Sequence, residues 1–389
     1  MRTTFAIIAI AGVWAALDVS GYAQGGSTSK VAADASQPQE QSVELAPEVK
    51  LEFRPQQPIP RITASPIVVS PVLCSPDGTP FVDFPDMSDF KVHAIYSLAP
   101  KGAVLFSSKS ITGLYDLTYQ SFFPGDSTVL LLMHGTSDSK ESAYTVYTGN
   151  GSQSKTGAGY RGAHQDYLAE YDRNGSFKSA VELPAGYHFW RVAFLPDGNL
   201  LALAYDRANA VPRLLLLDSG GQIFRPLEIP AQLQDSPELT AGETGPEINR
   251  ARAESSLSWW LFAPSGQKTI LYKAHSTAPL LEVGVAGASR EIPLEMPKGY
   301  EIDAVVPGND RLIVRYRRHG LSSSGSIDAN PEVVNYVLYQ VNPSDGTLLR
   351  QLDPGVGPLF NIACEQDGVF TAFSMENDKV IRMTAEVPK

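Results

Sequence analysis

The chain of 389 residues carries little charge. Charged residues make up 19% of it, whereas average globular proteins have roughly 25%. Its 31 Lys and Arg are outnumbered by 42 Asp and Glu, so the formal net charge is −11. Neutralising phosphates requires clustered Lys and Arg. The composition therefore argues against nucleic-acid binding.

Long apolar runs are absent beyond the N-terminus, so we expect no membrane span. Residues 1–23 have the pattern of a secretory signal: a positive start at Arg2, a short apolar core and small residues before a cleavage site near Ala23. A buried N-terminal helix is the alternative. Residues 24–47 are polar and lack apolar periodicity, which predicts a flexible leader. The mature chain is thus expected to be secreted or periplasmic.

Helical periodicity is also nearly absent, with residues 247–255 as the one exception. In its place, an apolar strand, a turn built on Pro, Asp or Gly, and a second apolar strand recur six times. The turns are centred on Pro76, Pro124, Pro196, Pro264, Pro307 and Gln366. Successive turns are 48, 72, 68, 43 and 59 residues apart. Without the polar insertions at 135–165, 233–256 and 320–332, the spacing is near the period of a four-stranded propeller blade.

The third unit shows a whole blade. Its four apolar segments are residues 188–196, 199–206, 213–218 and 222–229. Strands such as LLALAY, RLLLLD and TVLLLM are apolar at nearly every residue, which predicts sheets covered on both faces by neighbouring sheets. The sixth unit supplies only three strands, and residues 48–57 can provide its outer strand, which would remove an open edge. We therefore predict an all-β chain in which residues 48–389 form a single, monomeric six-bladed β-propeller.

The segment FLPDGNLLALAYD and the later LLLLDSGGQI (residues 194–206 and 214–223) resemble the repeats of NHL-repeat and TolB-like six-bladed propellers. The resemblance extends to uncharacterised exported bacterial proteins of that type. It implies the fold, but such propellers include ligand binders, scaffolds and several classes of enzyme.

Loops alternate between the two ends of a propeller, and all three insertions fall at the same end. We call it the loop-bearing end and the opposite one the short-turn end. Loops added to one end of a rigid scaffold commonly carry binding, although long surface loops are also tolerated without a role. Candidate ligand-binding residues at this end are Tyr187, His188, Trp190, Arg191, Trp259, Trp260 and Tyr300. Their rings either stack on sugars or anchor a peptide, or they fill the space between blades.

Catalytic motifs are scarce. The six His are scattered over five blades with none of the spacings typical of zinc sites, and no nucleophile elbow occurs. Oxygen-bearing residues at the loop-bearing end, namely Asp116, Glu301, Asp303 and Asn361, could bind Ca²⁺. Some six-bladed lactonases and related hydrolases use such a centre, and this resemblance is one of position only. No other cofactor is expected.

The two cysteines, Cys74 and Cys364, occupy equivalent places in units one and six, which should be neighbours in the ring. Equivalent positions on packed sheets lie about 10 Å apart, whereas a disulfide needs Cα atoms within about 7 Å. The sequence leaves both possibilities open, a disulfide between Cys74 and Cys364 or two free thiols. Two hypotheses for the function follow. One is an exported, non-catalytic propeller that binds a protein segment or a glycan; the other is a calcium-dependent hydrolase, lactonase or lyase.

Overall fold

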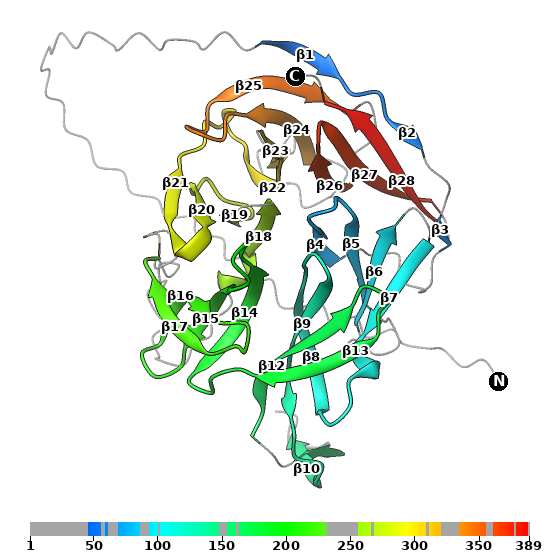
Figure 1. The fold of residues 1–389 in the computed structure, drawn as a ribbon, viewed down its shortest axis with the longest axis vertical. Helices are drawn as coiled ribbons and strands as arrows, with labels where there is room; N and C mark the ends of the chain where they lie inside the picture. Colours follow the sequence, from blue (N-terminus) through cyan, green and yellow to red (C-terminus); the bar gives the residue numbers. More distant parts are fainter. Residues whose placement is uncertain are drawn as a thin grey trace, which may run out of the picture. The chain divides into compact units, whose positions relative to one another are not determined.

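Six sheets of four or five strands form a β-propeller in the computed structural model of the chain (Figure 1). The structure describes residues 46–55, 59–60, 69–85, 93–99, 102–147, 154–160, 163–229, 231, 256–265, 268–308, 311–319, 334–354, 361–376 and 379–387. The predicted signal peptide, the leader up to residue 45 and most of the insertions at 233–256 and 320–332 lie outside these residues. The prediction of an all-β, six-bladed propeller is confirmed. Among the described residues, no helix has the length and hydrophobicity needed to cross a bilayer.

The first three blades each place four strands side by side. Blade one consists of β4 (Val69–Cys74), β5 (Pro80–Pro85), β6 (His93–Ala99) and β7 (Gly102–Ser107). Blade two consists of β8 (Tyr115–Pro124), β9 (Thr128–Thr136), β12 (Gln165–Asp172) and β13 (Phe177–Glu182). Blade three consists of β14 (Tyr187–Phe194), β15 (Leu200–Asp206), β16 (Val211–Leu217) and β17 (Ile223–Leu227). The insertion in blade two contains its own hairpin, β10 (Glu141–Tyr147) and β11 (Ser154–Tyr160).

The other three blades follow the same order. Blade four consists of β18 (Trp260–Ser265), β19 (Lys268–Lys273), β20 (Leu280–Gly284) and β21 (Ser289–Ile292). Blade five consists of β22 (Glu301–Pro307), β23 (Leu312–His319), β24 (Val334–Val341) and β25 (Leu348–Asp353). Blade six has β26 (Asn361–Gln366), β27 (Val369–Glu376) and β28 (Lys379–Glu386). Short 3-10 turns at Ser108–Ser110, Leu257–Trp259 and Val285–Gly287 connect strands.

Burial in blade three is greatest in its middle strands. All seven residues of β15 are buried, whereas the innermost strand β14 is only partly buried. The outer strand β17 contains only half-buried and exposed residues, as does β13, the outer strand of blade two. Burying both faces of the middle strands removes apolar surface from water, and this is the main favourable contribution to folding. The strand-one to strand-two turns need a positive φ, which glycine adopts without strain. Gly198 has a φ of +82° there, and its N–H donates to the Leu195 carbonyl.

The N-terminal segment completes the last blade, as predicted, but over different residues. Strands β2 (Arg54–Pro55) and β3 (Ile59–Pro60) pair antiparallel with β28 in blade six, whereas β1 (Ala46–Lys50) pairs parallel with β25 in blade five. Prolines lack the N–H that a strand ladder needs, so the proline-rich half of the segment makes only short edge pairings. Leu51, between the two halves, is buried.

Cys74 in β4 and Cys364 in β26 form a disulfide between blades one and six. Their Cα atoms lie 5.7 Å apart, well below the roughly 10 Å between packed sheets. The two residues belong to innermost strands, which converge towards the centre of the ring. The bridge joins positions 290 residues apart in the sequence and links the first blade covalently to the last.

Candidate functional site

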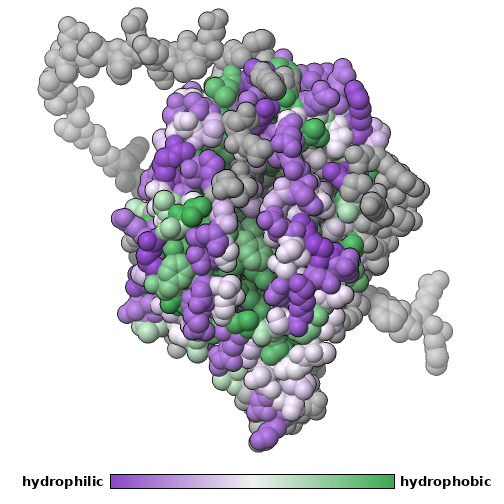
Figure 2. Space-filling view, viewed as in Figure 1, coloured by the Kyte–Doolittle hydropathy of each residue, from purple (hydrophilic) through white to green (hydrophobic). Residues whose placement is uncertain are grey.

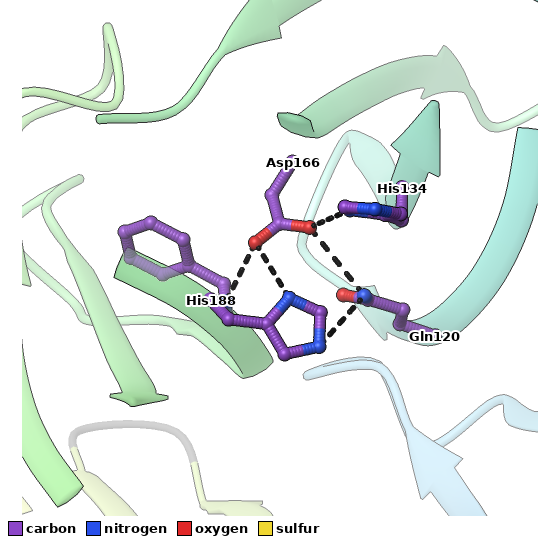
Figure 3. A network of polar contacts seen from close by, with 5 residues as sticks. Gln120, His134, Asp166 and His188 are labelled. Atoms are coloured by element: carbon purple, nitrogen blue, oxygen red, sulfur yellow. Dashed lines mark hydrogen bonds and ion pairs between the residues drawn. The ribbon is translucent and has the colours of Figure 1, made fainter. Parts of the chain in front are cut away.

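Four polar side chains meet at the loop-bearing end, where blades two and three adjoin (Figure 3). They are Gln120 on β8, His134 on β9, Asp166 on β12 and His188 on β14. Antiparallel pairing of β12 with β9 places Asp166 directly opposite His134. His188 comes from the innermost strand of the next blade. We call these four residues the histidine–aspartate cluster.

Asp166 is the centre of the cluster. Its Oδ1 lies 2.8 Å from His134 Nδ1, and its Oδ2 lies 3.1 Å from His188 Nδ1. The backbone N–H of Phe189 donates to Oδ2 at 2.7 Å. The Gln120 side-chain amide lies 3.4 Å from Oδ1 and 3.5 Å from His188 Nε2. One carboxylate therefore holds both imidazoles in place.

The electrostatics of Asp166 follow from these contacts. Its side chain has no exposed surface, and burial alone would raise the pKa of its carboxyl. The hydrogen bonds from His134 and His188 outweigh burial and lower that pKa to about 2. Asp166 is consequently ionised at neutral pH. An ionised carboxylate between two imidazoles can orient a base for proton transfer, or bind a cation.

Aromatic and imidazole rings surround the cluster. The ring of His188 lies edge-on to Trp190, with centroids 5.5 Å apart, and His134 lies 5.7 Å from His164. His164 is itself paired with Asp116, Nε2 to Oδ2, at 3.0 Å. Trp190 Nε1 and Gln120 Oε1 are buried and have no hydrogen-bond partner among the described residues. Burying a polar atom without a hydrogen-bond partner destabilises the folded state, unless water or a bound polar group forms that hydrogen bond.

Arg191 connects the cluster to blade four. Its guanidinium donates to the carbonyl oxygens of Trp190 at 2.9 Å, Ser258 at 3.2 Å and Gln120 at 3.4 Å. Burial lowers the pKa of Arg191, and the neighbouring Tyr119 and Tyr272 partly oppose that shift. Because its Nη1 and Nη2 atoms donate to backbone carbonyls of three blades, Arg191 acts in this structure to position blades two, three and four relative to one another, although its buried Nε has no hydrogen-bond partner among the described residues.

The two adjacent tryptophans of blade four have different environments. Trp259 is half-buried, and its ring lies 4.7 Å from that of His275. Trp260 is only 1% exposed and packs in the main apolar core. The Trp260 ring therefore offers almost no exposed surface to a ligand, and its place among the candidates stays an untested prediction. Trp259 keeps its place among the candidates.

The remaining predicted aromatic candidates lie further apart. Tyr187 starts β14 and packs at 6.0 Å from Phe189. Tyr300 precedes β22 in blade five, and the Arg318 guanidinium lies 5.0 Å from its ring centroid. Both rings are half-buried. Tyr187 thus stays close to the histidine–aspartate cluster, whereas Tyr300 belongs to another blade.

The acidic residues considered for calcium each pair with a base. Glu301 accepts a hydrogen bond from Arg317 at 2.8 Å, Asp303 from Arg315, and Asp116 pairs with His164. Asn361 begins β26, and its side chain lies outside the described part of the structure. These ion pairs would have to break before one Ca²⁺ ion could be coordinated by all three carboxylates. The calcium hypothesis stays a prediction.

A cavity of about 250 Å³ lies at the short-turn end of the ring. Turn residues of blades one, four, five and six line it, together with Cys364 and Glu365. Glu365 carries the one acidic side chain of that lining, and Arg311 approaches it at 3.7 Å. Its charge is thus compensated within the protein. Among the described residues, the polar cluster at the loop-bearing end is therefore a better candidate for a functional site than this cavity.

His134, Asp166 and Gln120 were not identified as site residues from the sequence. They are far apart along the chain and follow no local spacing. Only their positions in the repeat could have pointed to them. His134 lies near the end of the second strand of its blade and Asp166 near the start of the third, and both positions are at the loop-bearing end. His188, Trp190 and Arg191, in contrast, were predicted as candidates, and the structure places them within or beside the cluster.

Comparisons with known proteins give no further functional assignment. No protein-family model and no curated protein matches the sequence. Among solved structures, the chain is similar to a protein of unknown function from Bacteroides caccae, at 11% identity and a TM-score of 0.35 over 73% of this chain and 80% of that one. It is also similar to the GH74 xyloglucanase from Xanthomonas campestris, at 13% identity and a TM-score of 0.43 over 86% of this chain and 46% of the enzyme. A third similarity is to the β-propeller domain of the Trilobed protease from Pyrococcus furiosus, at 8% identity and a TM-score of 0.34 over 86% and 85% of the two chains.

Proposed function

We propose that the chain is an exported, non-catalytic binding propeller that recognises a glycan or a protein segment at its loop-bearing end. The observation that carries the proposal is the gathering of half-buried rings there: His188 and Trp190 from blade three and Trp259 from blade four. Flat rings offer stacking surfaces, and nearby polar groups fix the orientation of a ligand.

A glycan is the favoured ligand of the two. Protein interfaces usually present a contiguous apolar patch. The exposed large apolar side chains of the described residues are instead scattered over five blades, at Leu105, Phe224, Val285, Tyr336, Leu349 and Val369. Figure 2 agrees, since hydrophilic residues spread over the side it shows, with smaller hydrophobic areas between them. Rings set among polar side chains suit a sugar, and scattered apolar residues also support the proposal of a monomer.

Export is part of the proposal. It rests on the signal-like residues 1–23, with cleavage near Ala23, and is supported by the disulfide Cys74–Cys364, since disulfides persist in oxidising compartments. The mature protein would then be secreted or periplasmic. Its membership of the NHL-repeat or TolB-like type and the boundaries 48–389 remain predictions.

A hydrolase or lyase is the second candidate, and the histidine–aspartate cluster is the observation that favours it. An ionised carboxylate hydrogen-bonded to imidazole Nδ1 orients the ring so that Nε2 can accept a proton. His188 and His134 both have this relation to Asp166. The calcium-dependent version, using Asp116, Glu301, Asp303 and Asn361, is the less supported form of this candidate.

A glycan array probed with the mature protein, beginning at residue 24, tests the proposal. We expect selective binding that falls by at least about tenfold in Trp259→Ala and Trp190→Ala, because each removes a stacking ring. Phe224→Ala is the matched control, since Phe224 is an exposed aromatic residue of β17 outside the site. Binding to no glycan, or unchanged binding by both tryptophan variants, would contradict glycan recognition. Turnover of the bound glycan would favour the enzyme.

A further inference from the structure

Three potential metal ligands converge within the histidine–aspartate cluster. One nitrogen or oxygen atom from each of His134, Asp166 and His188 lies within 4.8 Å of the other two, and Figure 3 shows the side chains pointing towards a common centre. Across the described residues, this is the one such group of three or more His, Cys, Asp or Glu. We infer that these three residues bind a divalent transition-metal ion, with zinc the preferred one.

The distances fit an ion after small movements. Zinc binds nitrogen and oxygen ligands at about 2.0–2.2 Å in a tetrahedral arrangement, which sets neighbouring ligand atoms about 3.3 Å apart. The Asp166 oxygens lie 2.8 Å from His134 Nδ1 and 3.1 Å from His188 Nδ1. An ion in the cluster would replace the protons that these pairs now share. The three ligand atoms lie within 4.8 Å of one another, so they would move closer together on binding an ion.

The donor set selects the kind of ion. Two imidazoles and one carboxylate suit zinc, iron, nickel or copper, whereas Ca²⁺ and Mg²⁺ prefer oxygen ligands throughout. Three protein ligands also leave a tetrahedral ion one position for water or a bound molecule. The site is therefore different in chemistry and in residues from the predicted calcium centre of Asp116, Glu301 and Asp303.

Among the described residues, the surroundings of Asp166 hold no lysine or arginine cation that would compete with a metal ion for its oxygens. Glu301 and Asp303 each pair with an arginine, but Asp166 contacts no lysine or arginine side chain within the described part of the chain. Burying an ionised carboxylate is costly unless charge and hydrogen bonds compensate it. Here the contacts with the two imidazoles and the Phe189 N–H provide that compensation, and a divalent ion would replace the two imidazole contacts with direct metal–ligand bonds.

The surroundings are those of a preorganised metal site. Groups outside the ligand set commonly fix the ligands in place. Here the Phe189 N–H holds Asp166 Oδ2 at 2.7 Å, and the Gln120 amide lies 3.4 Å from Oδ1. The ligands stand on three strands of two blades, so the frame is rigid. The side chains of His134 and His188 remain 27% and 18% exposed, which leaves a route from solvent.

Calorimetric titration of the mature protein tests the inference directly. The protein is produced without a polyhistidine tag, stripped with a chelator and titrated with Zn²⁺ alone. We expect one ion per chain with a Kd of about 1 µM or tighter, and a visible spectrum typical of a nitrogen–oxygen site when Co²⁺ alone is the probe. Ca²⁺ should give no heat of binding at this site. Absence of Zn²⁺ binding would overturn the inference and leave a hydrogen-bonded network as the role of the cluster.

Variants show whether a bound ion lies in this cluster. His134→Gln and His188→Gln should each weaken Zn²⁺ binding by a factor of about 10–100 or more. His275→Asn is the control, because His275 lies in blade four and asparagine tolerates its φ of 58°. Melting temperatures without metal show that each variant is folded, and Zn²⁺ should raise that temperature only where it binds. Unchanged affinity in both glutamine variants would overturn the assignment.

Zinc binding can be separated from glycan recognition at Trp259, although His188 belongs to both proposed sites. Trp259→Ala removes a stacking ring but no ligand atom, so it should bind Zn²⁺ as the unmodified protein does. Loss of zinc binding in that variant, with the fold intact, would contradict the assignment of the ion to His134, Asp166 and His188.

Discussion

Two of the contacts between neighbouring blades differ in how they are held together. The closing seam, between blades six and one, is covalent and apolar: Cys74–Cys364 crosses it, and Val82, Phe373 and Val380 pack together beside it. The site seam, between blades two and three, has an apolar layer that includes Leu132 and Phe189. At its loop-bearing end, however, it carries the charged and imidazole groups of the histidine–aspartate cluster.

Chain connectivity explains the difference. Residues 183–186 run directly from β13 of blade two to β14 of blade three, so the site seam is held together by consecutive residues. Strands β26 to β28 of blade six lie at the opposite end of the sequence from blade one, and the nearest link along the chain is β3, which pairs with β28 and precedes β4. The closing seam therefore needs a disulfide and an N-terminal segment, whereas the site seam can accommodate polar groups that contribute less to stability. The polar cluster and the disulfide that closes the ring thus lie at different seams.

Removing the disulfide should have the largest effect. In Cys74→Ala/Cys364→Ala, the free energy of unfolding should fall by about 3–5 kcal/mol, because the bridge closes a loop of 290 residues in the unfolded chain. Denaturant unfolding of the variant and of the oxidised protein measures the loss. Each single alanine variant should lose a similar amount. An unchanged midpoint would mean that packing alone closes the ring.

The N-terminal segment should come next. Leu51 is only 2% exposed and packs with residues of blades five and six, such as Leu352 and Phe370. Leu51→Ala should lower the free energy of unfolding by about 2–4 kcal/mol, since it leaves a cavity in that cluster. Glu52→Ala is the matched control, because Glu52 is the exposed neighbour. Equal midpoints for the two variants would show that the segment does not stabilise its contact with blades five and six.

Much of the fold was predictable because it is repeated. The four segments expected in blade three, for example 199–206, coincide closely with the observed strands, such as β15 (Leu200–Asp206). Turn residues and apolar runs are local properties, and six copies reinforce one another. The closing segment was less predictable. Its pairing depends on where the prolines lie and on which blade edge is free, and both are settled by the assembled ring.

The site was predictable only in part, for a related reason. His188 and Trp190 could be placed at the loop-bearing end from the repeat alone. His134 and Asp166 become partners through strand register within blade two, and they reach His188 only because blade three packs alongside. Side-chain direction was equally hidden for the adjacent tryptophans, of which Trp260 is buried and Trp259 half-buried. The spacing of residues along the sequence predicts neither the contacts within the cluster nor the burial of each tryptophan.

At the site seam, Asp166→Asn should have a smaller effect than either change at the closing seam. An amide has one acceptor oxygen where the carboxylate has two, so one of the donors now served by Asp166 loses its partner, at a cost of about 1–3 kcal/mol. Asp172→Asn is the control. The Asp172 side chain, at the end of the same strand, accepts hydrogen bonds from the turn N–H groups of Asn174 and Ser176, and an asparagine oxygen can accept both. Urea unfolding of both variants checks the difference, and equal losses would contradict a special role for Asp166.

Deleting the β10–β11 hairpin should have the smallest effect. These two strands pair with each other and with no other strand of the described structure. Replacing residues 141–160 by a short Gly/Ser linker should change the free energy of unfolding by less than about 1 kcal/mol, because loop length contributes only logarithmically. Zinc affinity should also be unchanged, since no ligand atom lies in the hairpin. Calorimetry and denaturant unfolding of the deletion variant measure both quantities, and a destabilised protein would show that the site seam depends on its insertion as the closing seam depends on its N-terminal segment.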